Sequence, residues 1–251
     1  MLAKQRATTF KIELAGTVIK IEPMYDYIRN YCKEYLTESH EQFTVRTEQT
    51  DIDYERQKSE AEDKKEGNPV RAFSEGYLET LAVYRKITER LLTSNIILFH
   101  GSAIAVDGVA YLFTAKSGTG KSTHTRLWRE QFGERAIMIN DDKPLLELTE
   151  NGVFVHGTPW AGKHNLATKC SVPLKAICVL NRAETNHIKE VTSREIYGML
   201  LQQVYRPTDA EEMLQTMKHI DNLMNQVKFY QLGCNMDKEA AIISYNGMKY
   251  K

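Results

Sequence analysis

The sequence predicts an α/β protein in which a small N-terminal α/β module precedes a larger α/β core. Three observations support this class: alternating apolar and polar residues near the N-terminus, a helical apolar pattern before residue 92, and strands interleaved with helices beyond residue 95. A chain of 251 residues is long enough for two domains with separate cores. We place the boundary near Thr93, which gives a module over residues 1–95 and a core over residues 96–251.

The module is expected to begin with a hairpin and to end with an amphipathic helix. Its predicted elements, in chain order, are a hairpin over 10–21 that turns at 15–16, a helix over 24–36, a strand over 43–45, a solvated helix or mobile connection over 48–68, and a helix over 71–92. The last helix carries an apolar stripe at helical spacing, which comprises Tyr77, Leu81, Tyr84, Ile87 and Leu91. Charged and polar residues dominate 48–68, which indicates a solvated segment and not a functional patch.

The core is expected to contain several short strands and a mainly helical C-terminal third. Its predicted strands lie over 96–100, 103–106, 109–114, 136–139, 153–155 and 176–180, with a helix over 123–132 that stops at Gly133. In the C-terminal third, Thr208 and Glu211 form a capping box. The residues that follow at helical spacing predict a core-facing helix: Met213, Met217, Ile220, Met224 and Val227.

Composition excludes several classes of protein. Lysine plus arginine number 33 and so do aspartate plus glutamate, so the chain lacks the basic excess of a nucleic-acid binder. The four cysteines form no C-x-x-C pair, which predicts free thiols in a reducing compartment. No apolar run resembles a signal peptide or a membrane span. We therefore expect a soluble, cytoplasmic protein with neither a nucleic acid nor a membrane as partner.

The stretch TAKSGTGKSTHTRLW, residues 114–128, is the strongest functional signal. It matches the phosphate-binding pattern G-x-x-x-x-G-K-[ST] except at the first position, where Ala115 stands. It follows a strand and precedes a helix, so backbone N–H groups and the helix N-terminus converge on one anion. The alternative is a glycine-rich connecting turn. The residues expected to bind the nucleotide are Ser117, Gly118, Thr119, Gly120, Lys121, Ser122 and Thr123.

Lys121 would reach the β- and γ-phosphates, and the Ser122 hydroxyl would ligate Mg²⁺. A left-handed backbone at Ala115 would cost about 1 kcal/mol or more.

A pair of carboxylates, Asp141 and Asp142, ends the next predicted strand. Ligands of open α/β sheets lie at the carboxyl ends of strands, so both side chains should face the nucleotide. One carboxylate can hold Mg²⁺ and the other can accept a proton from an attacking hydroxyl. The alternative is a plain turn, because Asp-Asp-Lys-Pro is good turn chemistry.

Together, these motifs resemble the kinase core of the HPr kinase/phosphorylase family, and they are similar to the P-loop and Asp pair of ATP-dependent phosphoenolpyruvate carboxykinase, which shares that fold. The resemblance covers roughly residues 99–180 and rests on His100-Gly101, the glycine loop and the Asp pair. It implies that Lys121 and Ser122 bind ATP and Mg²⁺, and that Asp142 is the catalytic base with Asp141 as its supporting, metal-binding carboxylate. It also implies that His100 lies near the transferred phosphoryl group and that the chain forms a homo-oligomeric ring.

The sequence departs from the family where an E-x-R-G signature, whose glutamate helps to bind the metal, should fall near residues 154–157. The segment 157–165 that follows contains Trp160, which could wall the pocket, and Lys163, which could bind an acceptor carboxylate or a γ-phosphate oxygen. The alternatives are a core tryptophan and a solvated lysine. These departures argue against HPr as substrate and against phosphorylase activity.

We therefore expect an ATP- and Mg²⁺-dependent kinase that acts on a hydroxyl of a small molecule or a peptide. The alternative class is a nucleotide-binding regulatory module or slow ATPase, in which the Asp pair serves only the metal.

Overall fold

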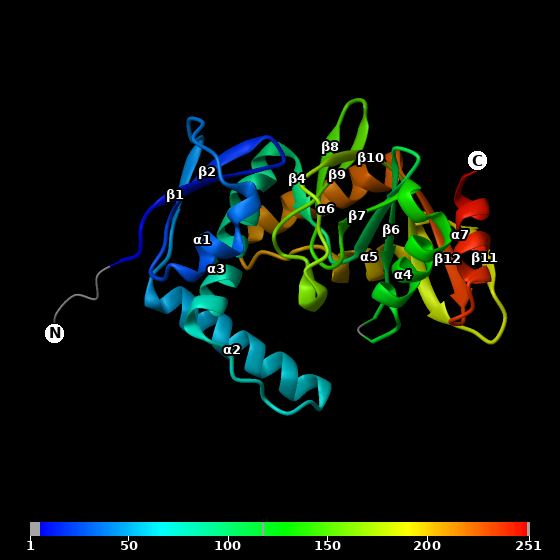
Figure 1. Ribbon diagram of the computed structural model, residues 1–251, viewed down its shortest axis with the longest axis horizontal. Coiled ribbons are helices and arrows are strands. Elements are labelled where there is room, and N and C mark those ends of the chain that lie inside the picture. Colours follow the sequence, from blue (N-terminus) through cyan, green and yellow to red (C-terminus); the bar gives the residue numbers. More distant parts are fainter. Residues whose placement is uncertain (1–5, 117, 250–251) are drawn as a thin grey trace. The chain divides into compact units, whose positions relative to one another are not determined.

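The computed structural model describes residues 6–116 and 118–249, and the chain divides into two compact units, Met1–Arg90 and Leu91–Lys251. The fold is mixed α/β, and the second unit is built around a curled central sheet (Figure 1). The predicted mixed α/β class is therefore confirmed. The assignment of a module and a kinase core to residues 1–95 and 96–251 stays a prediction.

The first unit is a three-stranded sheet with helices. Its elements are β1 (Phe10–Leu14), β2 (Thr17–Glu22), α1 (Tyr27–Tyr31), a 3₁₀ turn (Lys33–Tyr35), β3 (Phe43–Arg46), α2 (Gln49–Glu66) and α3 (Glu75–Leu91). The β1–β2 hairpin turns through Ala15 and Gly16, both at positive φ (47° and 70°), as a tight two-residue hairpin requires. The predicted helix over 24–36 is instead a short helix followed by a 3₁₀ turn.

Ion pairs between α2 and α3 explain why the segment 48–68 is so polar. Arg85 on α3 contacts Glu55 at 2.7 Å and Asp51 at 3.2 Å, and Lys86 contacts Asp51 at 2.6 Å. A capping box at Glu48 and Asp51 starts the helix. The segment is a helix, as one of the two alternatives had it, and its charges hold it against the neighbouring helix.

The second unit is built on a nine-stranded sheet. Its strands are β4 (Ile96–Leu98), β5 (Ser102–Val106), β6 (Val109–Thr114), β7 (Ala136–Asn140), β8 (Leu145–Thr149), β9 (Gly152–His156), β10 (Ser171–Arg182), β11 (His187–Val191) and β12 (Lys228–Cys234). The order is β4-β8-β9-β10-β6-β5-β7, and β12 pairs with both β10 and β11. Strands β6, β10 and β12 run parallel, whereas β5 is antiparallel to both of its neighbours, β6 and β7. It follows that β6, β7, β10 and β12 end at the same edge.

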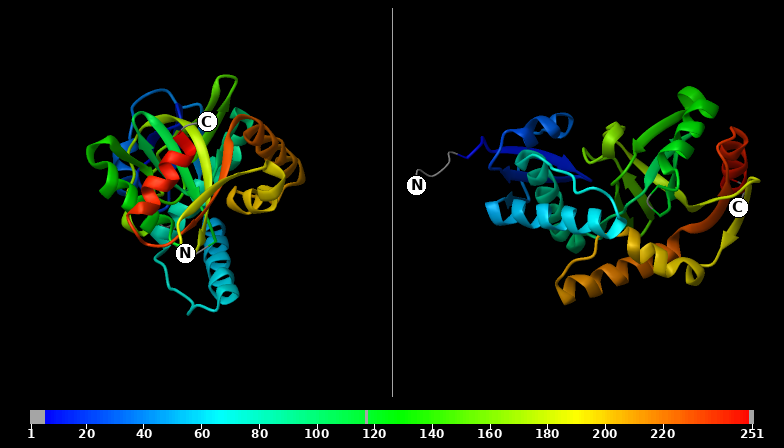
Figure 2. Two further views of the ribbon diagram at one scale, coloured as in Figure 1. Left: turned by 90° about the vertical axis from the view of Figure 1, so that its right-hand side faces the viewer. Right: turned by 90° about the horizontal axis from the view of Figure 1, so that it is seen from below.

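Helices cover both faces of this sheet. They are α4 (Lys121–Phe132), α5 (Ser193–Gln203), α6 (Ala210–Gln226) and α7 (Glu239–Lys249). On one face α4 and α7 enclose an aromatic core in which Trp128 packs 5.0 Å from Tyr111 and 5.6 Å from Tyr245, between ring centroids. On the other face α5 and α6 pack their apolar residues on the sheet. Figure 2 shows α6 (orange) and α7 (red) on opposite sides of the strands.

Three sequence-based predictions for the second unit need correction. The C-terminal third holds two strands as well as helices, because β11 and β12 pair with each other and β12 joins β10. Asp209, not Thr208, caps α6, and its carboxylate accepts from the backbone N–H groups of Glu211 and Glu212. The predicted stripe of α6 is confirmed at Ile220 and Val227, which are buried, but Met213 and Met217 are only half-buried, and Thr216, His219 and Leu223 complete the buried face.

Two further findings concern the helices and the cysteines. Among the described residues, no helix is both long and apolar enough to cross a membrane. All four cysteines are free thiols, as predicted.

Candidate active site

The chemistry-bearing segments of the second unit meet at one edge of the sheet. The glycine loop, which we define as residues 115–120, follows β6, the carboxylates Asp141 and Asp142 follow β7, and Arg182 ends β10 (Figure 1). Because β5 runs the other way, the residues just before it, His100 and Gly101, lie at the same edge, where Gly101 N donates to Asp142 O at 3.0 Å. This edge is the usual place for a ligand in an α/β sheet.

The glycine loop has the backbone that its sequence predicts. Gly118 and Gly120 adopt φ of +73° and +119°, which glycine takes at little cost. Ala115 is buried and is not among the residues at positive φ, so the expected cost of an alanine there does not arise. Ser117 lies outside the described residues.

Helix α4 begins directly after this loop. Gly120 is its N-cap residue, and among the described residues no side-chain hydrogen bond caps this helix end. An uncapped helix N-terminus that follows a glycine loop offers backbone donors to an anion. Ser122 and Thr123, in the first turn, are half-buried.

Lys121 is placed between the glycine loop and the carboxylates. Its Nζ lies 3.5 Å from Ala115 O and its side chain is half-buried. Burial lowers the pKa of Lys121, while the charges of Asp142 and Asp141 act in the opposite direction. The structure therefore brings the predicted phosphate-binding lysine into the field of the predicted carboxylate pair.

Asp141 is fixed by a hydroxyl that the sequence did not suggest. The carboxylate is 6% exposed, and Ser102 Oγ on β5 donates to its Oδ1 at 2.6 Å. Ser102 Oγ is also 3.1 Å from Thr125 Oγ1 on α4. The two hydroxyls join β5, α4 and the end of β7, so they fix Asp141 relative to the helix that carries Lys121.

The carboxylate of Asp142 contacts two side chains, those of His100 and Lys143. His100 Nε2 lies 3.3 Å from Oδ1, and Lys143 Nζ forms an ion pair with Oδ2. Burial opposes the charged form of Asp142, but the hydrogen bonds and charges of His100 and Lys143 outweigh it and hold the pKa well below its usual range. Lys143 was not among the predicted site residues.

A buried asparagine shapes the backbone that presents both carboxylates. Asn140 Oδ1 accepts from the backbone N–H groups of Asp142 at 2.8 Å and Lys143 at 2.7 Å. Its Nδ2 donates to both oxygens of Thr158 at 3.0 Å. The backbone at Asp141 and Asp142 is therefore a turn, as the alternative interpretation of Asp-Asp-Lys-Pro had it, and this turn also positions both carboxylates at the site.

The segment 157–165 lies against Asp142, as expected. At Gly162 (φ +69°) a Cβ would stand 3.1 Å from the Cβ of Asp142, and at Gly157 it would stand 1.9 Å from Thr168 O, so this path requires glycine at both positions. Trp160 is 2% exposed, which favours the core alternative over a wall of an open pocket. Lys163 is exposed in a short 3₁₀ turn beside Gly162.

No glutamate stands where the family signature would place one. His156 ends β9 there, with Nε2 2.9 Å from Glu147 Oε2 on the neighbouring β8. Burial lowers the pKa of His156 even though Glu147 acts against it.

The described part of the chain holds no group of three or more His, Cys, Asp or Glu side chains arranged for a metal ion. Mg²⁺ typically takes only one or two carboxylates and completes its shell with water and substrate phosphates. Ser122, Asp141 and Asp142 therefore fit a magnesium ion that binds together with a phosphate, and not an ion held by protein alone.

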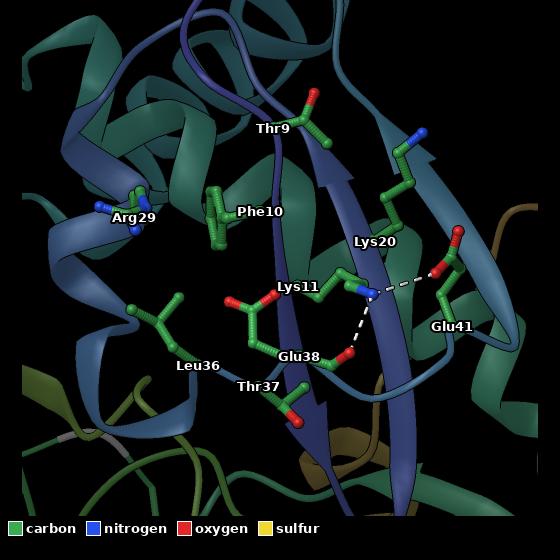
Figure 3. A pocket seen from close by; sticks show the side chains of 9 residues that line it. All are labelled: Thr9, Phe10, Lys11, Lys20, Arg29, Leu36, Thr37, Glu38 and Glu41. Carbon is green, nitrogen blue, oxygen red and sulfur yellow. Dashed lines mark hydrogen bonds and ion pairs between the residues drawn. The ribbon is translucent and has the colours of Figure 1, made fainter.

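A separate pocket of about 290 Å³ lies on the first unit (Figure 3). Its lining mixes cations and acids, and Lys11 inside it contacts Glu41 at 3.5 Å and the Glu38 carbonyl at 3.2 Å. None of the predicted site residues lines it. With its central lysine engaged by its own walls, this pocket shows no arrangement for chemistry.

The molecule is thus a mixed α/β protein whose predicted phosphate-binding and carboxylate residues meet at one sheet edge. The chain belongs to the family described as SynChlorMet cassette protein ScmC, whose model matches residues 74–242. Among curated proteins no match is found.

Solved structures that resemble it include the Hpr(Ser) kinase/phosphatase from Coxiella burnetii, which is 12% identical over 50% of this chain and 90% of that chain, with a TM-score of 0.29. The likeness is distant, and the functional argument comes from the geometry of the site.

Proposed function

We propose that the protein is an ATP- and Mg²⁺-dependent kinase that transfers the γ-phosphoryl group to a hydroxyl of a small molecule or a peptide. The observation that carries the proposal is the meeting of the glycine loop and Lys121 with Asp141, Asp142 and His100 at one edge of the sheet. A lysine and a helix N-terminus together attract the phosphates of a nucleotide. Carboxylates beside them can bind the metal ion and orient the acceptor hydroxyl.

In this proposal Lys121 and the backbone of the glycine loop bind the β- and γ-phosphates. Ser122 and Asp141 would hold Mg²⁺, which neutralises charge on the phosphate oxygens when bound. Ser102 donates to Oδ1 of Asp141, so Oδ2 is the oxygen that would bind the metal. The Thr125 hydroxyl contacts the backbone carbonyls of Lys121 and Ser122 and the Ser102 hydroxyl, so hydrogen bonds link the start of α4 to Asp141.

Asp142 would orient the acceptor hydroxyl and take up its proton. The hydroxyl oxygen bonds to the γ-phosphorus, the bond to the bridging oxygen breaks, ADP leaves, and the proton passes to Asp142. Its lowered pKa makes Asp142 a weak base, which suits a loose transition state in which the nucleophile needs positioning more than deprotonation. His100, 3.3 Å away, would hold the carboxylate in place.

The second candidate is a nucleotide-binding regulatory module or slow ATPase. It is favoured by the absence of the family's glutamate and by the Lys143–Asp142 ion pair, which occupies an oxygen that an acceptor would need. In this case Asp142 is neutralised by its neighbour and only the metal-binding role of the Asp pair remains.

A mass-spectrometric assay separates the two candidates. The purified protein is incubated with Mg-ATP and either a metabolite extract or a peptide pool, with Asp142→Asn as the matched control. The kinase proposal predicts a product heavier by about 80 Da, one HPO₃, that the control does not form. Release of inorganic phosphate without such a product would support the ATPase instead.

A further inference from the structure

Arg182 reaches the glycine loop from a different strand. It is the last residue of β10, which runs parallel to β6 with Val179 paired to Thr114, so Arg182 lies beyond the point where the loop leaves β6. Its Nη2 donates to Gly118 O at 2.6 Å, and the side chain is exposed.

The guanidinium has more donors than this contact uses. Arginine carries five N–H donors in a planar fork. In the described residues its hydrogen bond goes to the Gly118 carbonyl, and no ion pair links it to a carboxylate. A permanent positive charge at Gly118, two residues before the N-cap of α4, adds to an anion-attracting field, and the fork matches phosphate oxygens.

A purely structural anchor at this place would not need a charge. The loop that follows β10 is held by neutral amides: Asn235 Nδ2 donates to Glu184 O, and Asn186 Nδ2 donates to Asn235 Oδ1, each at 3.0 Å. The choice of arginine at 182 is explained if its remaining donors have an anionic partner.

We propose that Arg182 is a phosphate-binding residue of the nucleotide site, supplied from β10 of the same chain. One donor fixes the glycine loop through the Gly118 carbonyl, and the others bind oxygens of the β- or γ-phosphate. This inference rests on the proposed nucleotide site, which it extends by a second fixed cation besides Lys121.

Calorimetric titration of the full chain with Mg-ATP, Mg-ADP and AMP tests this role. The variants are Arg182→Gln, which removes the charge and shortens the side chain but leaves it polar, and Arg182→Lys, which keeps the charge. The matched control is Arg194→Gln, which removes one charge from an exposed arginine in the first turn of α5. Melting temperatures verify that all variants fold.

We expect Arg182→Gln to weaken the binding of Mg-ATP about tenfold or more, because it loses hydrogen bonds between a charged donor and the phosphates. The affinity for AMP should change less than twofold. Arg182→Lys should recover part of the loss and the control should match the parent. If the parent binds ATP and Arg182→Gln binds it equally well, or if AMP weakens as much as ATP, Arg182 is only a loop anchor. A parent that binds no nucleotide would refute the proposed function together with this inference. Weaker binding by Lys121→Ala with unchanged binding by Arg182→Gln would refute this inference alone.

Discussion

Two buried carboxylates, one in each unit, have different surroundings. In the first unit Glu79 is fully buried, and both its oxygens accept: from the backbone N–H groups of Met24 and Tyr25 and from the Thr47 hydroxyl. In the second unit Asp141 is almost as buried, but Ser102 holds only its Oδ1. A carboxylate that is saturated by protein donors serves the fold, whereas one with an oxygen left over can bind something else.

The surrounding charges differ in the same way. In the first unit Arg85 and Lys86 pair with acids of α2, so cation and anion satisfy each other. At the strand-end edge Lys121 lies between the glycine loop and the carboxylates, and Arg182 bonds a carbonyl instead of an acid. Lys143 pairs with Asp142, but the surroundings of Lys121 and Arg182 agree with the proposal that this edge binds an anion from outside the chain.

The largest effect is expected at Asp142. Asp142→Asn keeps the size of the side chain but cannot take up a proton, and loss of a general base typically costs about 10²- to 10⁴-fold in rate. Phosphoryl transfer, followed by mass spectrometry, should fall by that factor while ATP affinity stays within a few-fold. Transfer near the parental rate would show that Asp142 is not the base and would direct attention to Asp141 or His100.

The pH profile gives a second reading of the same residue. Because the folded-state pKa of Asp142 is depressed, its carboxylate stays ionised as pH falls through the ordinary range of an aspartate, and it is protonated only below that range. The transfer rate should therefore show no acid limb from this group as pH falls from about 5 to about 3.5, where an ordinary aspartate is already partly protonated. An acid limb in that range would contradict the lowered pKa.

Glu79 should affect stability and not binding. Glu79→Ala leaves two backbone N–H groups and one hydroxyl without their acceptor, which should cost about 3 kcal/mol of unfolding free energy. Urea unfolding measures it, with Glu62→Ala, an exposed glutamate on α2, as the control. A loss as small as that of the control, or a change in ATP affinity of the folded protein, would contradict the contrast between the two carboxylates.

A smaller effect is expected from the hydroxyl that holds Asp141. Ser102→Ala removes the donor to Oδ1, so the carboxylate is less well fixed and the Mg²⁺ concentration for half-maximal activity should rise roughly tenfold. Thr125→Val is the matched variant, because it removes the second hydroxyl without touching Asp141. Equal and negligible effects of both variants would remove Ser102 from the site.

The smallest effect is expected at the exposed Lys163. Lys163→Ala should raise the acceptor KM, or lower kcat, a few-fold, as loss of an exposed ion pair would, without changing ATP affinity. Lys218→Ala, an exposed lysine on α6, is the control. A fall in ATP affinity would assign Lys163 to the nucleotide, and no change in any constant would mean that it is a solvated surface lysine.

Local patterns predicted much of the fold. The β1–β2 hairpin, the β6–loop–α4 unit and β7 all have signals within a few neighbouring residues, namely alternation, glycine and an apolar run. Strands β8, β11 and β12 were missed. The pairing of β11 with β12 joins segments about 40 residues apart and has no local signal, whereas β8 pairs with β9, the next strand along the chain.

The site residues also fall into those with a local sequence signal and those without one. Lys121, Asp141 and Asp142 belong to short motifs and were predicted, and the structure places them together. Ser102, Thr125, Lys143 and Arg182 were not, because their relevance depends on which strand ends meet at the edge. Trp160 shows the opposite error: the sequence suggested that it walls the pocket, but its side chain is buried in the core.

The central claim is that the strand-end edge binds the triphosphate of a nucleotide, and calorimetric titration with Mg-ATP tests it most directly. Lys121→Ala is compared with Lys116→Ala, which removes an exposed lysine from the same loop. The parent and Lys116→Ala should bind Mg-ATP alike, and Lys121→Ala should bind it at least about tenfold more weakly, because a charge-assisted contact to the phosphates is lost. Unchanged affinity in Lys121→Ala, or no binding by the parent, would contradict the claim.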